Sequence, residues 1–461
     1  MATLWRQQAT FRPVDTARTL GRNLGLAAFA VFAGVVPMMP TNELKVDASL
    51  GAVVMLAVAT YLQFRGGEPW AASPLDRPAM LLLALATVAT VFSVEPFLSL
   101  VPSGRRGEGL IMTAAYVLVS VAAARLRRRE ALVLLIALLA AGVVIGLASI
   151  GQYYGIDVPR FLGFQPVASG EYYGLAPATR DGYSFGTRAY GTLGNPVFLG
   201  GYVVLLLPLA LGPLFSASRW RWGYLLSATV LYAALVASQT RAAWVGALVA
   251  GAILLLVVVR HPHTWRRAAA TAAMFAAVTA VMVTTRPEAT VVGRAAATFR
   301  LSDAALAERL YLWKQTLPMI AQRPLLGWGY STLLGRFPDL GSKEYQRVYG
   351  WSFVGIDTPH NEILHVAYSI GLLGLAAYVW FLVRIARSLR RALGHSDVRP
   401  AATSLVAGLV GYAVWLQLAW NHIGAANVFW LLGGLAVALD DAREEASPRV
   451  DAALGLRHLW D

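Results

Sequence analysis

Residues 197–216 read VFLGGYVVLLLPLALGPLFS, a run of 20 residues without a charged side chain. An α-helix crosses the hydrocarbon core of a bilayer with about 20 mainly apolar residues. Prolines before and within the run, such as Pro196 and Pro208, are tolerated in membrane helices where neighbouring helices satisfy the backbone. This stretch therefore predicts a membrane-spanning helix.

Runs of the same kind recur along the whole chain. The 461 residues are 57% hydrophobic and 14% charged, whereas soluble domains carry about 25% charged residues. The composition excludes a soluble globular fold. It predicts an all-α polytopic membrane protein in which residues 1–461 form a single integral membrane domain. We expect about 12 spans, near residues 23–40, 49–64, 79–94, 108–124, 131–151, 197–216, 223–239, 242–259, 268–285, 360–383, 401–420 and 424–440.

Arginines predict the orientation of these spans. The net charge is +14 and the chain has no cysteine, which excludes disulfides and thiolate metal sites. The arginines gather in alternate loops, for example in the run Arg125–Arg129. The positive-inside rule places such loops and both termini in the cytoplasm. Membrane topology thus explains the excess of basic over acidic residues, and we expect no nucleic-acid partner.

Two loops on the expected outer face are long, and loops above about 12–15 residues are usually functional or disordered. The outer loop 152–196 is rich in Gly, Tyr and Phe, which suits an ordered layer near the lipid head groups. The large periplasmic loop 286–359 is predicted to be partly helical, from about residue 304 to 317, and Pro318 then kinks or ends the helix. One apolar stripe on this helix suits a position flat on the membrane, and it comprises Leu306, Leu310, Trp313 and Leu317.

Three arginines on the expected outer face are candidate ligands for an anion. Arg241 lies in a tight turn between two spans, Arg309 on the predicted loop helix, and Arg188 just before residue 197. Each guanidinium has a structural alternative, because arginine also snorkels to the head groups or ties down a carbonyl group. The functional alternative is binding of a diphosphate, whose oxygens match the planar guanidinium fork.

His360 opens the tenth predicted span at the outer interface. Imidazole, with an ordinary pKa of about 6.5, suits general-base catalysis, although histidines at helix ends often serve in packing. Asp357 and Glu362 are both close enough in sequence to orient the ring, and the sequence leaves the choice open. The catalytic reading needs a supporting observation from the rest of the chain.

Several absences narrow the function. The interiors of the predicted spans are expected to lack Asp and Glu before Asp440, which argues against a proton-coupled transporter. The sequence has no Walker A motif, so ATP-driven export is not expected. Neither an Asp-x-Asp pair nor a cluster of metal-ligating residues stands in the outer loops, so we expect no metal site.

Several segments, taken together, resemble the superfamily of O-antigen ligases and O-antigen polymerases, which are bacterial envelope glycosyltransferases. The resemblance extends over roughly residues 100–375. The segments that carry it are, in chain order, Arg105–Leu110, Gly191–Pro196, Ser238–Trp244, Glu308–Arg309 with Trp313, Arg323–Gly329, and Pro359–Leu364 followed by Gly371–Gly374.

This resemblance implies a metal-independent, inverting transfer of a glycan from undecaprenyl diphosphate to an acceptor hydroxyl. It also implies a GT-C-like fold in the bacterial inner membrane, with the site on the periplasmic face and no cofactor. Arg241 and Arg309 would bind the diphosphate, with Arg188 and Arg106 as further ligands, and His360 would activate the acceptor. The residues expected to support the site are Glu308, Trp313, Asn361 and Glu362.

The acceptor stays open at this point. A ligase passes the glycan to the lipid A core, a polymerase passes it to another lipid-linked repeat unit, and a protein-directed enzyme passes it to Ser or Thr. We rank the ligase first and the polymerase second. The non-enzymatic alternatives are a flippase for lipid-linked glycans and a scaffold for glycan assembly.

Overall fold

The computed structural model describes residues 13–39, 42–67, 71–101, 107–156, 186–215, 220–260, 264–289, 291–297, 304–337, 343, 347 and 356–440. Over these ranges the chain is helical and has no strand element, which confirms the predicted fold class. Each of the predicted spans falls on a helix. Among the described residues, six helices are long and apolar enough to cross a membrane, so the full number of spans stays a prediction.

The helices follow one another along the chain with short connections. The order is α1 (Pro13–Ala30), η1 (Val31–Val35), η2 (Val36–Met38), α2 (Asn42–Arg65), α3 (Asp76–Val91), α4 (Pro96–Leu100), α5 (Leu110–Ala123), α6 (Arg128–Tyr153), α8 (Pro196–Leu214), α9 (Arg221–Ser238), α10 (Arg241–Arg260), α11 (Trp265–Thr285), α12 (Val291–Ala297), α13 (Ala304–Gln322), α14 (Leu333–Arg336), α16 (Glu362–Ala392), α17 (Arg399–Leu416) and α18 (Ile423–Ala438).

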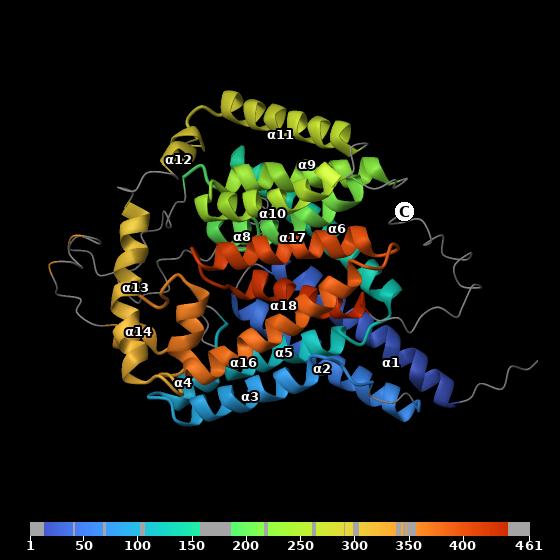
Figure 1. The fold of residues 1–461 in the computed structure, drawn as a ribbon, viewed down its shortest axis with the longest axis vertical. Coiled ribbons are helices and arrows are strands. Elements are labelled where there is room, and N and C mark those ends of the chain that lie inside the picture. Colours follow the sequence, from blue (N-terminus) through green and yellow to red (C-terminus); the bar gives the residue numbers. More distant parts are fainter. Residues whose placement is uncertain are drawn as a thin grey trace, which may run out of the picture.

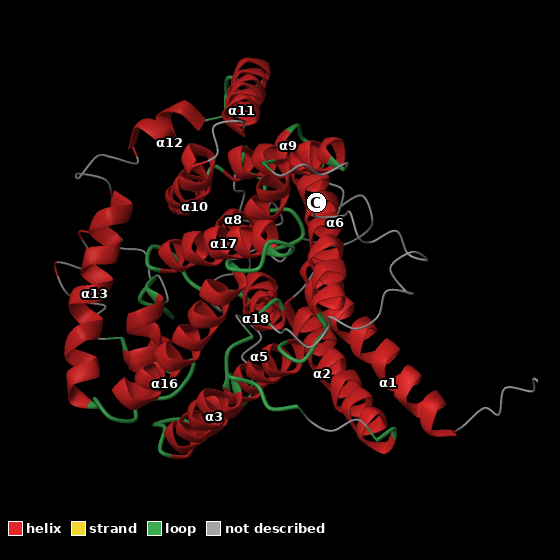
Figure 2. Ribbon diagram, turned by 45° about the vertical axis from the view of Figure 1, so that its right-hand side comes forward, coloured by secondary structure: helices red, strands yellow, loops and turns green. Residues whose placement is uncertain are grey.

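Most of these helices form a bundle, and α13 stands across one end of it. Figure 1 shows α3, α5, α16 and α17 running from side to side with α13 upright at the left, and Figure 2 shows the same arrangement from another angle. Arginines at or just after the ends of helices make ion pairs at the far end of the bundle. Arg125 contacts Asp76 at 2.6 Å, and Arg391 contacts Asp440 beyond α18. The bundle therefore separates these arginines from α13.

Helices α8, α10 and α17 pack closely because small residues lie where they cross. A Cβ on Gly246 of α10 would lie 2.7 Å from the carbonyl oxygen of Gly411 in α17. Apolar lipid provides no hydrophobic drive for helices to associate, so close packing of this kind supplies much of the attraction. The crossing fixes the end of α17 relative to the start of α10.

Helix α16 is broken at Gly371, whereas the predicted span 360–383 was uninterrupted. Gly371 has φ 72° and ψ −179°, a conformation available to glycine but not to residues with a Cβ. The break leaves backbone groups inside the helix without helical partners. The expectation of one continuous helix was wrong because a loop distant in sequence supplies those partners.

The loop that fills the break is the segment Arg323–Gly329. The amides of Trp328 and Gly329 donate to the carbonyl oxygens of Tyr368 and Ser369, at 2.8 and 3.0 Å. Leu372 donates in return to Pro324 at 2.7 Å. Backbone groups buried at membrane depth need such partners. Two of the segments that carry the resemblance thus interlock.

The large loop 286–359 contains a small hydrophobic core of its own. Helix α13 starts as predicted but continues through Pro318 to Gln322, so the proline does not end it. Leu310 and Leu317 are each 54% exposed, on the side away from that core. The core joins α13 to α14 and to the start of α16, and it comprises Tyr311, Leu312, Met319, Ile320, Leu333, Phe337, Ile356, Ala367 and Tyr368.

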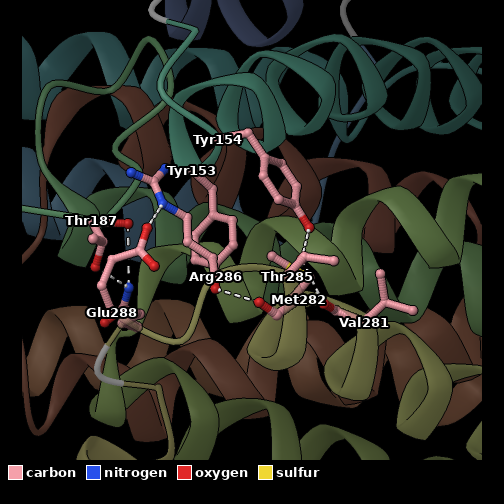
Figure 3. Close-up of polar contacts among 9 residues, drawn as sticks. Tyr153, Tyr154, Thr187, Val281, Met282, Thr285, Arg286 and Glu288 are labelled. Atoms are coloured by element: carbon pink, nitrogen blue, oxygen red, sulfur yellow. Dashed lines mark hydrogen bonds and ion pairs between the residues drawn. The ribbon is translucent and has the colours of Figure 1, made fainter.

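The beginning of this large loop is tied to the end of α6, as Figure 3 shows. The Tyr153 hydroxyl donates to the carbonyl oxygen of Met282 at 3.0 Å. Arg286 lies over the Tyr153 ring at 5.8 Å and pairs with Glu288 at 2.6 Å. Of the outer loop 152–196, residues 157–185 lie outside the described part of the chain, so the predicted covering layer stays a prediction.

Candidate functional site

Arg241 is the first residue of α10 and follows a tight turn. Gln239, two residues before it, adopts a left-handed conformation with φ 49° and ψ 34°. Such a conformation is costly for a residue with a side chain and persists where the surroundings hold it. Gln239 is fully buried, and its amide donates to the Thr187 hydroxyl at 3.0 Å. The hydrogen bond between Gln239 and Thr187 therefore holds the turn that precedes Arg241.

Two more arginines converge on the same turn. Arg188 donates to the carbonyl oxygen of Ser238 at 3.2 Å and to the Thr240 hydroxyl at 3.3 Å. This is the carbonyl tie that we had left open for Arg188. Arg294 of α12 donates to the carbonyl oxygen of Gln239 at 2.8 Å. Arginines from three separate segments thus surround one turn, and such clusters favour phosphate oxygens.

We had not singled out Arg294 from the sequence. It lies in an Ala/Thr/Arg segment without a distinctive pattern. Only the fold brings α12 to the turn between α9 and α10. Arg106, by contrast, lies outside the described residues, and its predicted role stays a prediction.

Arg309 lies on α13 and reaches the loop 417–422 between α17 and α18. Its Nε donates to the carbonyl oxygen of Leu418 at 2.8 Å. Leu418 lies seven residues past the Gly411 crossing, and Arg241 lies five residues before Gly246 at the same crossing. Since α10 and α17 pack side by side, Arg241 and the 417–422 loop emerge at the same end of the bundle.

His360 is held beside the same loop. Its imidazole stacks on the Trp420 indole, with ring centroids 4.2 Å apart and planes at 17°. The backbone of His360 has φ 54°, and its amide donates to the Thr358 hydroxyl at 3.3 Å. Positive φ in a residue other than glycine often marks a functional site.

Two of the residues predicted to support the site hold His360 from either side along the chain. Trp313 of α13 donates its indole N–H to the carbonyl oxygen of Pro359 at 3.1 Å. Asn361 accepts from the Leu364 amide and so caps α16, while its own amide donates to Gln417 at 3.4 Å. His360 is thereby tied to α13, to α16 and to the loop 417–422.

Trp420 was missed in the sequence. It also packs edge-on against Phe198 of α8, with centroids 5.6 Å apart, and Phe198 in turn stacks on His422 at 3.9 Å. The available signal was the group Gln417, Trp420, Asn421 and His422, which interrupts two apolar runs.

The remaining predicted residues are Glu308 and Glu362. Glu308 is half-buried on α13 beside Arg309. Glu362 is 9% exposed and lines a cavity together with Glu108 and His365. The expectation of spans without carboxylates was therefore wrong, because Glu362 belongs to a candidate membrane-spanning helix. In the described part of the chain, no three His, Asp or Glu side chains form a group suited to a metal ion.

The chain is similar to known proteins over its central part. Residues 224–379 match the family model described as O-antigen ligase. A candidate polysaccharide ligase of Rickettsia prowazekii is 24% identical over 135 residues, which are 28% of this chain and 30% of that protein. A second, from Rickettsia bellii, is 25% identical over 133 residues, or 27% and 30%. The chain thus spans less than a third of the length of these curated relatives.

These comparisons and the apolar helices together establish a membrane protein and confirm the superfamily that the sequence segments resembled. Residues 224–379, which carry Arg241, Arg309 and His360, are thus the part of the chain that is similar to the O-antigen ligase family.

Proposed function

We propose that this chain is a glycosyltransferase that moves a glycan from undecaprenyl diphosphate to an acceptor hydroxyl, without a metal ion and with inversion. The acceptor we rank first is the lipid A core, which makes the protein an O-antigen ligase. One observation carries the proposal. Arg309 and His360 are fastened to the same loop, 417–422, at the end of the bundle where Arg241 begins α10.

The arginines suit the donor. Arg241 and Arg309 supply permanent positive charges whose planar N–H groups match diphosphate oxygens. Arg188 and Arg294 are committed to carbonyl groups of the turn and hold Arg241 in place. As the bond between the anomeric carbon and the diphosphate oxygen breaks, negative charge grows on the leaving oxygen. Positive groups positioned before the reaction stabilise that charge.

His360 suits the acceptor. In the proposed step a ring nitrogen of His360 takes the proton of the acceptor hydroxyl. The acceptor oxygen then attacks the anomeric carbon from the face opposite the diphosphate, and the carbon–oxygen bond to the diphosphate breaks. The products are an inverted glycosidic bond, undecaprenyl diphosphate and a protonated imidazole. The stack on Trp420 favours that imidazolium, because aromatic faces attract cations.

The position of α13 suits a substrate embedded in lipid. It lies across the end of the bundle (Figure 1), with Leu310 and Leu317 exposed on its outer side. Apolar side chains on such a helix bury themselves in the interfacial layer of a bilayer. The positive-inside rule would make this end periplasmic and the arginine-rich end cytoplasmic. Lipid-linked diphosphate would then meet Arg309 at the depth of the head groups.

The proposal is tested with purified full-length protein in lipid nanodiscs. The donor is undecaprenyl-diphosphate-linked glycan, and three acceptors are offered separately: lipid A core, a second lipid-linked repeat, and a Ser/Thr peptide. We expect transfer to the lipid A core, undiminished by a chelator of divalent ions, and its loss in His360→Ala. His395→Ala, at the far end of α16, is the matched control and should transfer normally.

Each alternative gives a different result. Transfer only to the lipid-linked repeat would make the protein a polymerase, and transfer only to peptide would make it a protein glycosyltransferase. Translocation of donor without any new glycosidic bond would favour a flippase. Full transfer by His360→Ala would rule out the proposed base, and dependence on a divalent ion would rule out the metal-free mechanism.

A further inference from the structure

A cavity between α3, α5, α16 and α18 lies close to His360 in the chain, and Arg241 is not among the residues that line it. It measures about 90 Å³, and one water needs about 10–15 Å³ by the same measure, so it holds several waters or part of a small ligand. Two of its lining residues neighbour the proposed site. Glu362 lies two residues after His360, and Asn421 follows Trp420 directly.

The polar wall of the cavity is built from side chains that the proposed reaction does not use. His365 Nε2 lies 3.5 Å from Glu108 Oε1, and both side chains are largely buried, at 14% and 17% exposure. Glu362 and Asn421 line the cavity beside this pair. Tyr330, from the large loop, and Thr113 of α5 line it as well. Two carboxylates, an imidazole, an amide and a phenol thus face one small space.

Glycine backbone geometry places Glu108 in this wall. Gly109, directly after it, has φ 149° and begins α5 as the N-cap residue. A Cβ there would lie 2.9 Å from the carbonyl oxygen of Val101. Glu108 and Gly109 belong to Arg105–Leu110, a segment that carries the resemblance, and Glu108 itself has no part in the proposed transfer step. This segment therefore forms part of the cavity wall.

The chemistry of the wall selects among ligands. An anion such as diphosphate is disfavoured, because two carboxylates would face it. A hydrocarbon chain would leave the carboxylates buried beside apolar groups, which is costly. A hydroxyl group both donates and accepts hydrogen bonds. Hydroxyl groups therefore satisfy carboxylate oxygens and an imidazole nitrogen in either protonation state.

His365 provides a second, independent indication of a ligand. Its Nδ1 is buried and has no hydrogen-bond partner among the residues that the structure describes. An unpaired buried polar atom costs about 1–3 kcal/mol, so such atoms are usually paired with a ligand or water. Burial raises the pKa of Tyr330 to about 12, and its neutral phenol adds another hydrogen-bonding group to the wall.

We propose that the cavity formed by Glu108, Glu362, His365, Asn421 and Tyr330 binds the hydroxyl groups of a neutral sugar ring of the acceptor. The assignment of this ring to the acceptor rests on the proposed function, while the binding of a neutral sugar does not. The molecule then divides its substrates by charge. Arginines take the anionic donor, and the carboxylates of the cavity take the uncharged sugar.

Binding is measured without turnover, in full-length His360→Ala protein in nanodiscs, by saturation-transfer NMR. The probes are the methyl glycosides of glucose, galactose and N-acetylglucosamine, and inorganic diphosphate in a separate titration. We expect at least one methyl glycoside to bind. Glu108→Gln, Glu362→Gln and His365→Gln should each weaken it about ten-fold or more, the loss typical of a hydrogen bond to a charged group. Diphosphate binding should not change.

Two further variants make the result decisive. Glu95→Gln removes an exposed carboxylate at the same end of the bundle, outside the cavity, and should leave glycoside binding unchanged. Ala426→Leu adds volume at a residue that lines the cavity while leaving the polar side chains unchanged, and it should abolish glycoside binding while diphosphate still binds. Glycoside binding that survives Ala426→Leu and the three polar variants would overturn the proposal, as would failure of all three glycosides to bind.

The result of the glycoside-binding experiment is independent of the result of the transfer assay. Glycoside binding lost in the cavity variants would stand even if His360→Ala retained transfer. Equally, His360-dependent transfer with no glycoside bound in the cavity would leave the proposed function in place and remove only this inference.

Discussion

The imidazole of His360 lies against the indole of Trp420, with ring centroids 4.2 Å apart and planes inclined by 17°. Trp420 is itself braced edge-on by Phe198. The plane of the proposed base is therefore set by aromatic packing. Transfer depends on the orientation of reacting groups, and small misplacements lower the rate strongly.

We therefore expect Trp420→Ala to lower kcat about ten-fold or more, equivalent to about 1.4 kcal/mol in the barrier, while the KM for the donor changes little. Trp420→Phe keeps an aromatic face and should restore most of the rate. Steady-state kinetics in nanodiscs measure both constants. Equal rates for Trp420→Ala and the wild type would show that the stack does not position the base.

Substitutions of the arginines at the turn between α9 and α10 should lower the activity to two different extents. Arg241→Ala removes the proposed diphosphate ligand and should lower kcat/KM about 100-fold or more, the range seen when a charge-stabilising group is lost. Arg294→Ala removes a tie to Gln239 and should cost about ten-fold, a typical effect of one hydrogen bond to a charged group.

Lysine replacements and a distant arginine serve as controls for that series. Arg294→Lys should recover part of the activity, because it keeps the charge but loses the planar fork. Arg387→Ala changes an exposed arginine of α16 near the opposite end and should transfer normally. Equal losses for Arg241→Ala and Arg387→Ala would point to a general charge effect on the membrane protein.

Gly371→Ala should destabilise the fold. A Cβ at this position would lie 2.1 Å from the carbonyl oxygen of Leu325, and the residue has positive φ. Strain of this kind costs of order 1–3 kcal/mol before the clash is added. Thermal unfolding in detergent should show a clear fall in Tm, and hydrogen exchange should show reduced protection of Trp328 and Gly329, whose amides bond to α16.

Gly251→Ala is the matched control for that change. Gly251 lies in α10 with helical geometry, and a Cβ there would meet nothing within 4 Å. Alanine favours helices over glycine by about 0.5–1 kcal/mol, so Tm should stay equal or rise. A similar fall in Tm for both variants would mean that the break in α16 does not need glycine.

The break at Gly371 could not be predicted from the sequence. Apolar run length is a local property, so the positions of the helices followed from it. The partner loop Arg323–Gly329 lies some 40 residues earlier in the chain, and hydropathy contains no information about such a contact. In the candidate site, Arg241, Arg309 and His360 could be proposed from the sequence because each lies in a recognisable segment. Arg294 and Trp420 lie outside those segments, and only the fold brings them to the candidate site.

The indole of Trp313 offers a direct test of whether α13 holds the site in place. Its N–H donates to the carbonyl oxygen of Pro359, the residue before His360. Trp313→Phe retains the ring packing and removes the hydrogen-bond donor. The variant therefore loses the contribution of one hydrogen bond, about 1 kcal/mol. We expect kcat to fall about five-fold at unchanged Tm. Trp222→Phe, at an indole that is 66% exposed, should change neither quantity. A fall in Tm without a fall in kcat would assign Trp313 to folding of the large loop, and α13 would then cover the site without positioning its base.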